Sequence, residues 1–237
     1  MSNVQLIHGD CMEYMATLPD RAFELAIVDP PYGINIGQVV GGGKPFGSSG
    51  RGKVIFPKTY RGFDDSRIPE QKYFTELKRV TENQIIWGGN YFIEHLSNTP
   101  CFIVWDKDNS GNFADCELAW ASFKTVTRKF TFRWNGMLQQ NMKQKENRIH
   151  PTQKPVALYK WLLTHYAKAG DKILDTHVGS ASSLIACHQM GFEFVGFEID
   201  PDYHKAATER LERARAQVSM LDIGGTSQQM EQIEMEV

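Results

Sequence analysis

The residue types that could do chemistry gather directly after the apolar run at 25–28, in the tetrapeptide Asp29, Pro30, Pro31, Tyr32. Two prolines stop a strand, so the tetrapeptide should lie just beyond a strand's carboxyl end. There the Asp29 carboxylate and the Pro30 backbone carbonyl can accept hydrogen bonds from both N–H groups of a base amine such as adenine N6. Such acceptors, fixed in advance by the proline ring, draw the amine nitrogen toward tetrahedral geometry and make it a better nucleophile.

The aromatic ring of Tyr32 adds a stacking surface to these acceptors. Enzymes that modify a base must take it out of the duplex, and the extruded base needs a ring or apolar face to stack on. We therefore predict that residues 29–32 are catalytic. The competing interpretation is a turn that merely ends a buried strand, and the tetrapeptide alone does not separate the two.

A second turn with ligand-binding character runs from Asp175 to Ser183, after a strand predicted at 172–174. Ligands of open α/β sheets bind at the carboxyl ends of strands, and Gly179 would let the backbone pass close to one. Glu198 ends the next predicted strand, 23 residues after Asp175. This is about the spacing at which a carboxylate binds a ribose hydroxyl.

One glycine and one acid in this turn fit a pyrophosphate poorly. They favour a cofactor with a ribose and a cationic amino-acid tail, because carboxylates suit that tail. The competing interpretation is an ordinary strand–turn–helix crossover with a glycine for geometry.

The charge is unevenly placed along the chain, although the formal net charge is only −2. Residues 37–62 carry five basic side chains and no acidic one, and residues 124–148 carry seven basic side chains against one acid. Such segments on an acidic body could form a local phosphate-binding face or be two solvated loops. The candidate DNA ligands are Lys53, Lys58, Arg61, Arg128, Lys129, Arg133, Lys143, Lys145 and Arg148.

The composition bounds the class of protein. A chain of 237 residues with 41% hydrophobic and 23% charged residues suits one large α/β domain. The four cysteines form no C-x-x-C pair, and the histidines show no metal-ligand spacing, so we expect a reducing cytoplasm and no metal. No apolar run could cross a bilayer, and we read no signal peptide at the N-terminus.

Strands and helices alternate along the predicted chain, which indicates a largely parallel sheet with helices on both faces. Residues 37–62 predict a mobile loop, residues 124–134 a hairpin, and residues 218–237 a disordered tail after one domain at 1–217. The expected strands are 4–7, 25–28, 84–87, 101–105, 172–174 and 194–197, and the expected helices are 10–18, 69–81, 155–170, 183–190 and 201–217.

Five elements in order resemble the amino-methyltransferases of DNA that act on adenine N6 or cytosine N4, in their permuted β group, where the catalytic motif precedes the cofactor motif. These elements are residues 8–11, 29–32, 150–155, 175–183 and 196–200, and they span nearly the whole chain. The resemblance implies a Rossmann-like methyltransferase fold with a mostly parallel seven-stranded sheet and S-adenosylmethionine as cofactor. It assigns the cofactor site to Asp10, Cys11, Thr152, Lys154, Asp175, His177, Gly179, Ser180, Ser182, Ser183, Glu198 and Ile199.

Two departures from the family pattern stand in the cofactor turn. Thr176 and His177 replace Pro-Phe, and Ala181 replaces the second glycine of Asp-Pro-Phe-x-Gly-Ser-Gly-Thr-Thr. We expect His177 to stack on the cofactor in place of the phenylalanine, or else to fill a polar corner. The changes could weaken cofactor binding.

The expected function is methyl transfer from S-adenosylmethionine to adenine N6 of duplex DNA, with the target base flipped out. Asp rather than Ser before Pro-Pro-Tyr favours adenine over cytosine in this family. The alternatives are N4-cytosine methylation, RNA adenine methylation, and a catalytically silent protein that binds cofactor and DNA. The resemblance also suggests a homodimer. Little chain is left for a separate recognition domain, so we expect a short target site or weak sequence preference, read by segments 37–62 and 124–148.

A nucleophilic cysteine for C5-cytosine methylation is a weaker interpretation. Pro100-Cys101 has the required residue order, but Cys101 directly precedes the apolar run at 102–105 and is better explained as a core residue.

Overall fold

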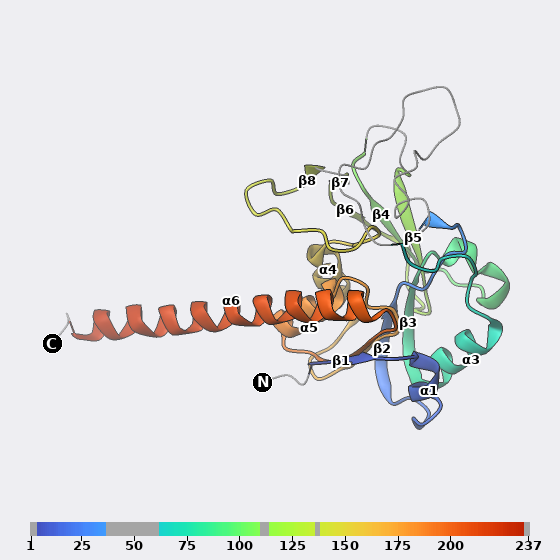
Figure 1. Cartoon of the computed structure of the whole chain (residues 1–237), viewed down its shortest axis with the longest axis horizontal. Helices are drawn as coiled ribbons and strands as arrows, with labels where there is room; N and C mark the ends of the chain where they lie inside the picture. The colour runs from blue at the N-terminus through green and yellow to red at the C-terminus, as the bar shows by residue number, and fades with distance from the viewer. Residues whose placement is uncertain (1–3, 37–61, 110–113, 136–137, 235–237) are drawn as a thin grey trace.

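The computed structural model describes residues 4–36, 62–109, 114–135 and 138–234, and Figure 1 shows its course. In chain order the elements are β1 (Val4–His8), α1 (Cys11–Met15), β2 (Phe23–Val28), α3 (Gln71–Val80), β3 (Thr81–Trp87), η1 (Gly89–Tyr91), η2 (Ile93–His95), β4 (Phe102–Asp106), β5 (Cys116–Ala121), β6 (Arg128–Thr131), β7 (Trp134–Asn135), β8 (Leu138–Gln139), α4 (Val156–Tyr166), β9 (Lys172–Asp175), α5 (Ser182–Met190), β10 (Glu193–Glu198) and α6 (Pro201–Glu234).

One mixed sheet organises the described residues, with eight strands in the order β1-β10-β9-β2-β3-β5-β4-β6. The pairings β1–β10, β10–β9, β9–β2, β2–β3 and β4–β6 are parallel. Only β5 runs antiparallel to both of its neighbours, β3 and β4. The expectation of a mostly parallel α/β sheet is therefore confirmed, with eight strands in place of the expected seven.

The alternation of side chains along the strands sends apolar groups to two separate cores. In β2, Leu25 and Ile27 face the core that contains α4, α5 and α6, whereas Ala26 and Val28 face the core that contains α1 and α3. All four are buried because helices cover both faces of the sheet. This explains why the strand reads as a continuous apolar run.

The chain changes direction across the sheet between β9 and β2. From β9 the chain crosses through α5 to β10 on one side, and from β2 it crosses through α3 to β3 on the other side. Ligands of open α/β sheets bind in the crevice at the carboxyl ends of strands where the order reverses. The tetrapeptide 29–32 follows β2 and the turn 175–183 follows β9, so both lie at this crevice.

Local sequence explains the helices that flank the crevice. Asp10 caps α1 by accepting a hydrogen bond from the Met12 backbone N–H at 2.8 Å, the role expected of a helix-capping aspartate. The spacing of Tyr73, Phe74 and Leu77 places them all on the buried side of α3.

The predicted hairpin at 124–134 is wrong. Its residues form β6, which pairs in parallel with β4, with Ile103 opposite Arg128. The alternating pattern did indicate a strand, but β4 offers an unpaired sheet edge and Phe130 packs on the core, so the partner comes from a distant segment. A short hairpin forms later, between β7 and β8.

The expected disordered tail at 218–237 also differs from the structure. Helix α6 continues to Glu234, and Figure 1 shows it extending beyond the sheet. The Gln, Glu and Met residues of this segment favour helix, which outweighs the pair of glycines at 224–225. The expected loop at 37–62 lies outside the described residues except for its last position. Among the helices that the structure describes, none is long and apolar enough to cross a membrane.

Candidate active site

The catalytic tetrapeptide is held by side-chain contacts at the end of β2. The Tyr32 hydroxyl donates a hydrogen bond of 2.6 Å to Asp29 Oδ1, and the Lys154 ammonium donates one of 2.6 Å to Asp29 Oδ2. Lys154 Nζ also lies 3.3 Å from the Tyr32 hydroxyl. The Asp29 side chain is 16% exposed, so the carboxylate is oriented but still reachable. Both of its oxygens keep a further lone pair that could accept an N–H from a substrate.

Behind Asp29 lies a buried chain of alternating charges. Lys154 Nζ forms a second ion pair with Glu117 Oε2 at 3.0 Å, and Glu117 Oε1 accepts a hydrogen bond of 2.5 Å from Lys107. Burial raises the pKa of Glu117, but the two lysine charges outweigh it and lower that pKa to about 2. Burial lowers the pKa of Lys154, but Asp29 and Glu117 outweigh it and raise that pKa overall. Glu117 and Lys154 are therefore both charged at neutral pH.

Sequence reasoning missed Glu117 and Lys107 as partners of the catalytic motif. Glu117 lies in β5, a strand that the sequence did not predict, and Lys107 follows β4. The one available signal was a glutamate inside the otherwise apolar hexapeptide at 116–121.

The ring of Tyr32 is packed among other aromatic residues. It stacks on Tyr91 with a centroid separation of 5.0 Å and an interplanar angle of 15°, and Phe92 meets it edge-on at 6.1 Å. Tyr91 is 43% exposed, so the stack opens to solvent. A Cβ on Gly88 would lie 2.3 Å from Tyr32 Cε1, and Gly88 has φ +70°, so both space and backbone require glycine there.

The predicted cofactor turn is held mainly by short-range hydrogen bonds. Asp175 accepts hydrogen bonds from the His177 backbone N–H at 2.9 Å and from the Ser183 hydroxyl at 2.7 Å. Glu198 accepts hydrogen bonds from the backbone N–H groups of Gly179 and Asp200, each at 2.9 Å. The two strand-end acids are thus fixed next to the turn.

Burial raises the pKa of Asp175 to about 7, and the charges of Asp29 and Glu198 act in the same direction. The hydrogen bonds that Asp175 accepts only partly oppose this rise. Within the described residues Asp175 forms no ion pair, so no cationic partner offsets this effect of burial. A positively charged ligand in the crevice would favour its ionised form.

The two replaced positions of the turn have clear structural consequences. His177 is partly buried against Tyr73, with ring centroids 5.5 Å apart, and desolvation lowers its pKa to about 4, so the ring is neutral. Ala181 adopts φ +64°, the left-handed conformation that glycine tolerates best. An alanine here therefore carries backbone strain that the family's glycine would avoid.

The segment at 150–155 lies next to the cofactor turn. The His150 ring is the nearest neighbour of Gly179, about 3.8 Å from where a Cβ would lie. His150 Nδ1 bonds the Thr152 hydroxyl at 3.0 Å, and burial lowers the pKa of His150 to about 3. Arg210 of α6 links the cofactor turn to Glu146. It donates hydrogen bonds to the Ser180 carbonyl, the Ser182 hydroxyl and the Glu146 carboxylate.

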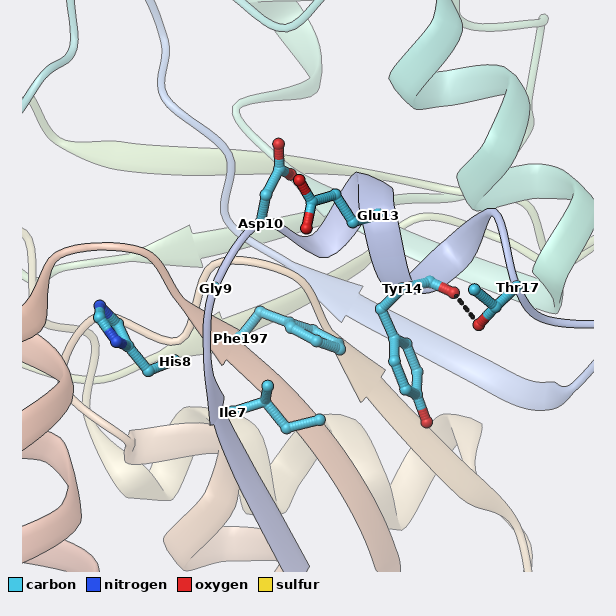
Figure 2. Close-up of a pocket in the computed structure, with 8 residues that line it drawn as sticks. All are labelled: Ile7, His8, Gly9, Asp10, Glu13, Tyr14, Thr17 and Phe197. Atoms are coloured by element: carbon cyan, nitrogen blue, oxygen red, sulfur yellow. Dashed lines mark hydrogen bonds between the residues drawn. The ribbon is translucent and has the colours of Figure 1, made fainter.

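A pocket of about 310 Å³ opens beside Asp10 at the ends of β1 and β10. Figure 2 shows the carboxylates of Asp10 and Glu13 at one end of it and the rings of Tyr14 and Phe197 side by side, with centroids 5.0 Å apart. The lining of the pocket therefore combines two carboxylates with two aromatic rings.

Three residues singled out from the sequence differ in exposure. Ile199 is 67% exposed, although its carbonyl bonds His8. Cys11 is buried at the start of α1, and burial raises its pKa to about 12. Cys101 is a fully buried core residue, as the sequence predicted. Within the described residues, no group of three His, Cys, Asp or Glu side chains could hold a metal.

The predicted DNA ligands fall into four groups. Lys129 and Arg133 are exposed and form ion pairs, Lys129 with Asp106 at 3.1 Å and Arg133 with Asp108, and Arg128, Lys143 and Lys145 are also exposed. Arg148 lies over the Trp134 ring, 4.6 Å from its centroid. Three further candidates lie outside the described residues, namely Lys53, Lys58 and Arg61.

Comparison with known proteins places this geometry in a family. Residues 53–209 match a family model for N6/N4 methylases described as "DNA methylase". The matched stretch includes the cofactor turn and Glu198 but not residues 29–32. Type II methyltransferase M2.DpnII of Streptococcus pneumoniae is 23% identical over 87% of this chain and 89% of its own length.

Two solved structures share the fold. The complex of M1.HpyAVI with S-adenosylmethionine is 21% identical, with TM-score 0.50 over 87% of this chain and 99% of that chain. The cytosine-N4-specific PvuII DNA methyltransferase is 14% identical, with TM-score 0.57 over 91% of each chain. Since the family model covers more than half of the sequence, the chain belongs to the N6/N4 DNA methylase family, whose members are S-adenosylmethionine-dependent DNA methyltransferases.

Proposed function

We propose that this chain transfers the methyl group of S-adenosylmethionine to the N6 amine of adenine in duplex DNA. The observation that carries the proposal is the position of the Asp29 carboxylate and the Tyr32 ring at the end of β2, beside β9 and its cofactor turn. Both half-sites share the crevice where the strand order reverses, so acceptor and donor of the methyl group could meet there.

The acidic and aromatic residues at the carboxyl ends of the strands suit the chemistry of this cofactor. Glu198 is placed to accept ribose hydroxyls, and the pocket beside Asp10, with its aromatic floor, suits an adenine ring. Asp175 is a buried acid without a cationic partner, which a positively charged amino-acid tail would supply. When bound, S-adenosylmethionine supplies an electrophilic methyl group on a sulfonium, whose sulfur leaves as a neutral thioether.

The remaining positions of the predicted cofactor site are proposed on their places around the crevice. Gly179, Ser180, Ser182 and Ser183 belong to the turn, Thr152 bonds His150, whose ring lies nearest to Gly179, and Cys11 and Ile199 follow strands β1 and β10. His177 is half-buried and meets the Tyr73 ring edge-on, so we assign it the role of shaping the cofactor turn in preference to stacking on the cofactor.

The acceptor chemistry follows from the residues at 29–32. Asp29 and the Pro30 carbonyl accept the two N–H bonds of the amine, which frees the nitrogen lone pair for in-line attack. The new N–C bond forms as the S–C bond breaks, and the surplus proton of the nitrogen leaves through the acceptors to water. Pro31 keeps the backbone rigid, and the Tyr32 ring supports the base.

The amine must leave the duplex to reach Asp29, because its target atom is inaccessible inside a base-paired stack. Tyr91 stacks on Tyr32 at the open side of the site and is 43% exposed. We therefore add Tyr91 to the candidate base-contacting residues. An extruded base would displace this ring or pack beside it.

DNA phosphates are assigned to the basic residues of segments 37–62 and 124–148. Of the described candidates, Arg128, Lys129, Arg133, Lys143 and Lys145 are exposed, as phosphate ligands must be. Because phosphate contacts release counterions, affinity for DNA should fall steeply as salt rises. Equal affinity at low and high salt would contradict this assignment. The homodimer stays a prediction.

Methylation of cytosine N4 is the second candidate. The same acceptors would serve an N4 amine, and the fold is shared with the cytosine-N4-specific PvuII enzyme. We favour adenine because an aspartate precedes Pro-Pro-Tyr. The likeness to a Type II methyltransferase favours a modification enzyme of a restriction–modification pair.

The test is to incubate the protein with S-adenosylmethionine and unmethylated duplex DNA, digest the product and quantify nucleosides by mass spectrometry. Asp29→Ala runs alongside, with Asp171→Ala, in the turn before β9, as matched control. We expect N6-methyladenine from wild type and control, and a loss of about a hundredfold or more for Asp29→Ala. N4-methylcytosine would overturn the choice of base, and no methylated nucleoside would overturn the proposed activity.

A further inference from the structure

We propose that Lys154 is a positioning residue of the methyl-acceptor site, which orients the Asp29 carboxylate from a buried charge network, and that it does not bind the cofactor. This inference rests on the proposed function above. The family resemblance alone assigns the segment at 150–155 to the cofactor, so the structure points to a different task for one of its residues.

The contacts of Lys154 define the network. Its side chain is 2% exposed, and its ammonium lies 2.6 Å from Asp29 Oδ2 and 3.0 Å from Glu117 Oε2. The same ammonium lies 5.3 Å from the centroid of the Trp87 ring and 5.8 Å from that of the Tyr32 ring. The ammonium is therefore enclosed by two carboxylates and two aromatic rings.

The charges of the network balance in pairs. Lys154 and Lys107 are the two cations, and Asp29 and Glu117 are the two anions, joined in the order Asp29–Lys154–Glu117–Lys107. A buried charge is costly unless it is paired, so each member holds its neighbour in place. The anions and cations come from four separate segments of the chain, and the network locks those segments together.

The consequence for Asp29 is a fixed orientation. Lys154 holds Oδ2 and the Tyr32 hydroxyl holds Oδ1, so the carboxylate cannot rotate without breaking a bond at one end. Acceptors that are fixed before the reaction lower the barrier because they need no reorganisation during it. Losing Lys154 should therefore slow methyl transfer while leaving the cofactor groups around Glu198 and Asp175 intact.

The experiment compares Lys154→Met with the matched control Lys172→Met, whose lysine forms only an exposed ion pair of 4.0 Å on β9. Two quantities are measured: the single-turnover methylation rate at saturating cofactor, and the dissociation constant of S-adenosylmethionine by calorimetry. We expect a rate loss on the order of a hundredfold for Lys154→Met. We also expect its cofactor affinity to stay within about threefold of wild type, and Lys172→Met to match wild type in both quantities.

Lys154→Arg and Glu117→Gln keep the inference falsifiable if Lys154→Met folds poorly. Arginine retains a cation at Asp29, so it should restore part of the rate. Glu117→Gln removes the charge that pairs with Lys154 and Lys107, so the methylation rate should fall by about tenfold, with cofactor affinity unchanged.

A Lys154 variant that loses cofactor affinity but keeps its rate at saturation would overturn the inference in favour of cofactor binding. A wild-type rate in Lys154→Met would overturn it as well. Wild-type turnover, measured in the same assay, tests the proposed function on its own.

Discussion

The two halves of the candidate site are built in different ways. In the cofactor half, Asp175 and Glu198 receive hydrogen bonds from residues at most 19 positions away in the sequence. In the catalytic half, Asp29 is held by Lys154, which is 125 positions away, and Tyr32 stacks on Tyr91. One half is thus organised by its own turn and the other by contacts across the fold.

This difference predicts how each half responds to damage. A turn held by local backbone bonds should tolerate distant substitutions, whereas a carboxylate held by remote side chains should depend on them. Substitutions in the first half should therefore change cofactor affinity, and substitutions in the second half should change the rate or the packing around Tyr32.

The largest effect is expected for Gly88→Ala. The new Cβ would lie 2.3 Å from Tyr32 Cε1, at a residue with φ +70°. Strain and overpacking together should lower the free energy of unfolding by about 3 kcal/mol. The displaced Tyr32 ring should also reduce the methylation rate. Denaturant unfolding and single-turnover kinetics measure the two effects.

Gly191→Ala is the matched control for this collision. Gly191 has φ +79°, but no atom of the described residues lies within 4 Å of its added Cβ. Gly191→Ala should lower the free energy of unfolding only by the backbone strain, about 1 kcal/mol, and should leave the methylation rate unchanged. Equal losses for the two variants would show that Gly88 matters for its backbone alone.

Glu198→Gln tests the cofactor half. The neutral amide would lose charge-assisted hydrogen bonds to ribose hydroxyls, which should weaken S-adenosylmethionine binding by about thirtyfold. Calorimetry measures this change. The rate at saturating cofactor should stay close to wild type, because Asp29 and Lys154 are untouched. A variant slowed at saturation with unchanged affinity would break the division between the two halves.

Asp175 predicts a pH dependence of cofactor binding. Its pKa is raised to about 7, so the ligand-free protein gains stability from this group at low pH and loses it as pH rises from about 4 to 7. A cationic cofactor prefers the ionised carboxylate, so its affinity should rise about tenfold between pH 6 and pH 8. Calorimetry across this range measures the slope.

Asp175→Asn should flatten this slope, because an amide does not titrate. Asp171→Asn, in the exposed turn before β9, should keep the wild-type slope. A slope that survives Asp175→Asn would assign the titration to another group.

The smallest effect is expected for Ala181→Gly. Glycine would relieve the strain at φ +64°, but the change removes a fully buried methyl group from the core. These opposing contributions are each about 1 kcal/mol, so the free energy of unfolding should change by less than about 1 kcal/mol. Denaturant unfolding checks the balance. A loss above 2 kcal/mol would show that packing dominates the turn.

Much of the fold could be predicted because it rests on local patterns. The apolar run at 25–28 and the helical spacing at 73, 74 and 77 each appear within one short window of sequence. Strand β5 escaped prediction because Glu117 interrupts its apolar pattern, and β6 was assigned the wrong partner because strand pairing joins distant segments. Pairing partners are chosen by the assembled sheet, which a sequence window does not contain.

By itself, the sequence determined the order of the motifs, the strand-end positions of Asp29 and Asp175, and the glycine and acids of the cofactor turn. These features depend on residue type and on neighbours close along the chain. Only the tertiary structure decided that Lys154 meets Asp29, that Glu117 and Lys107 complete a buried charge network, and that Tyr91 stacks on Tyr32. Buried ion pairs and ring stacks join groups from remote segments, and folding alone brings them within bonding distance.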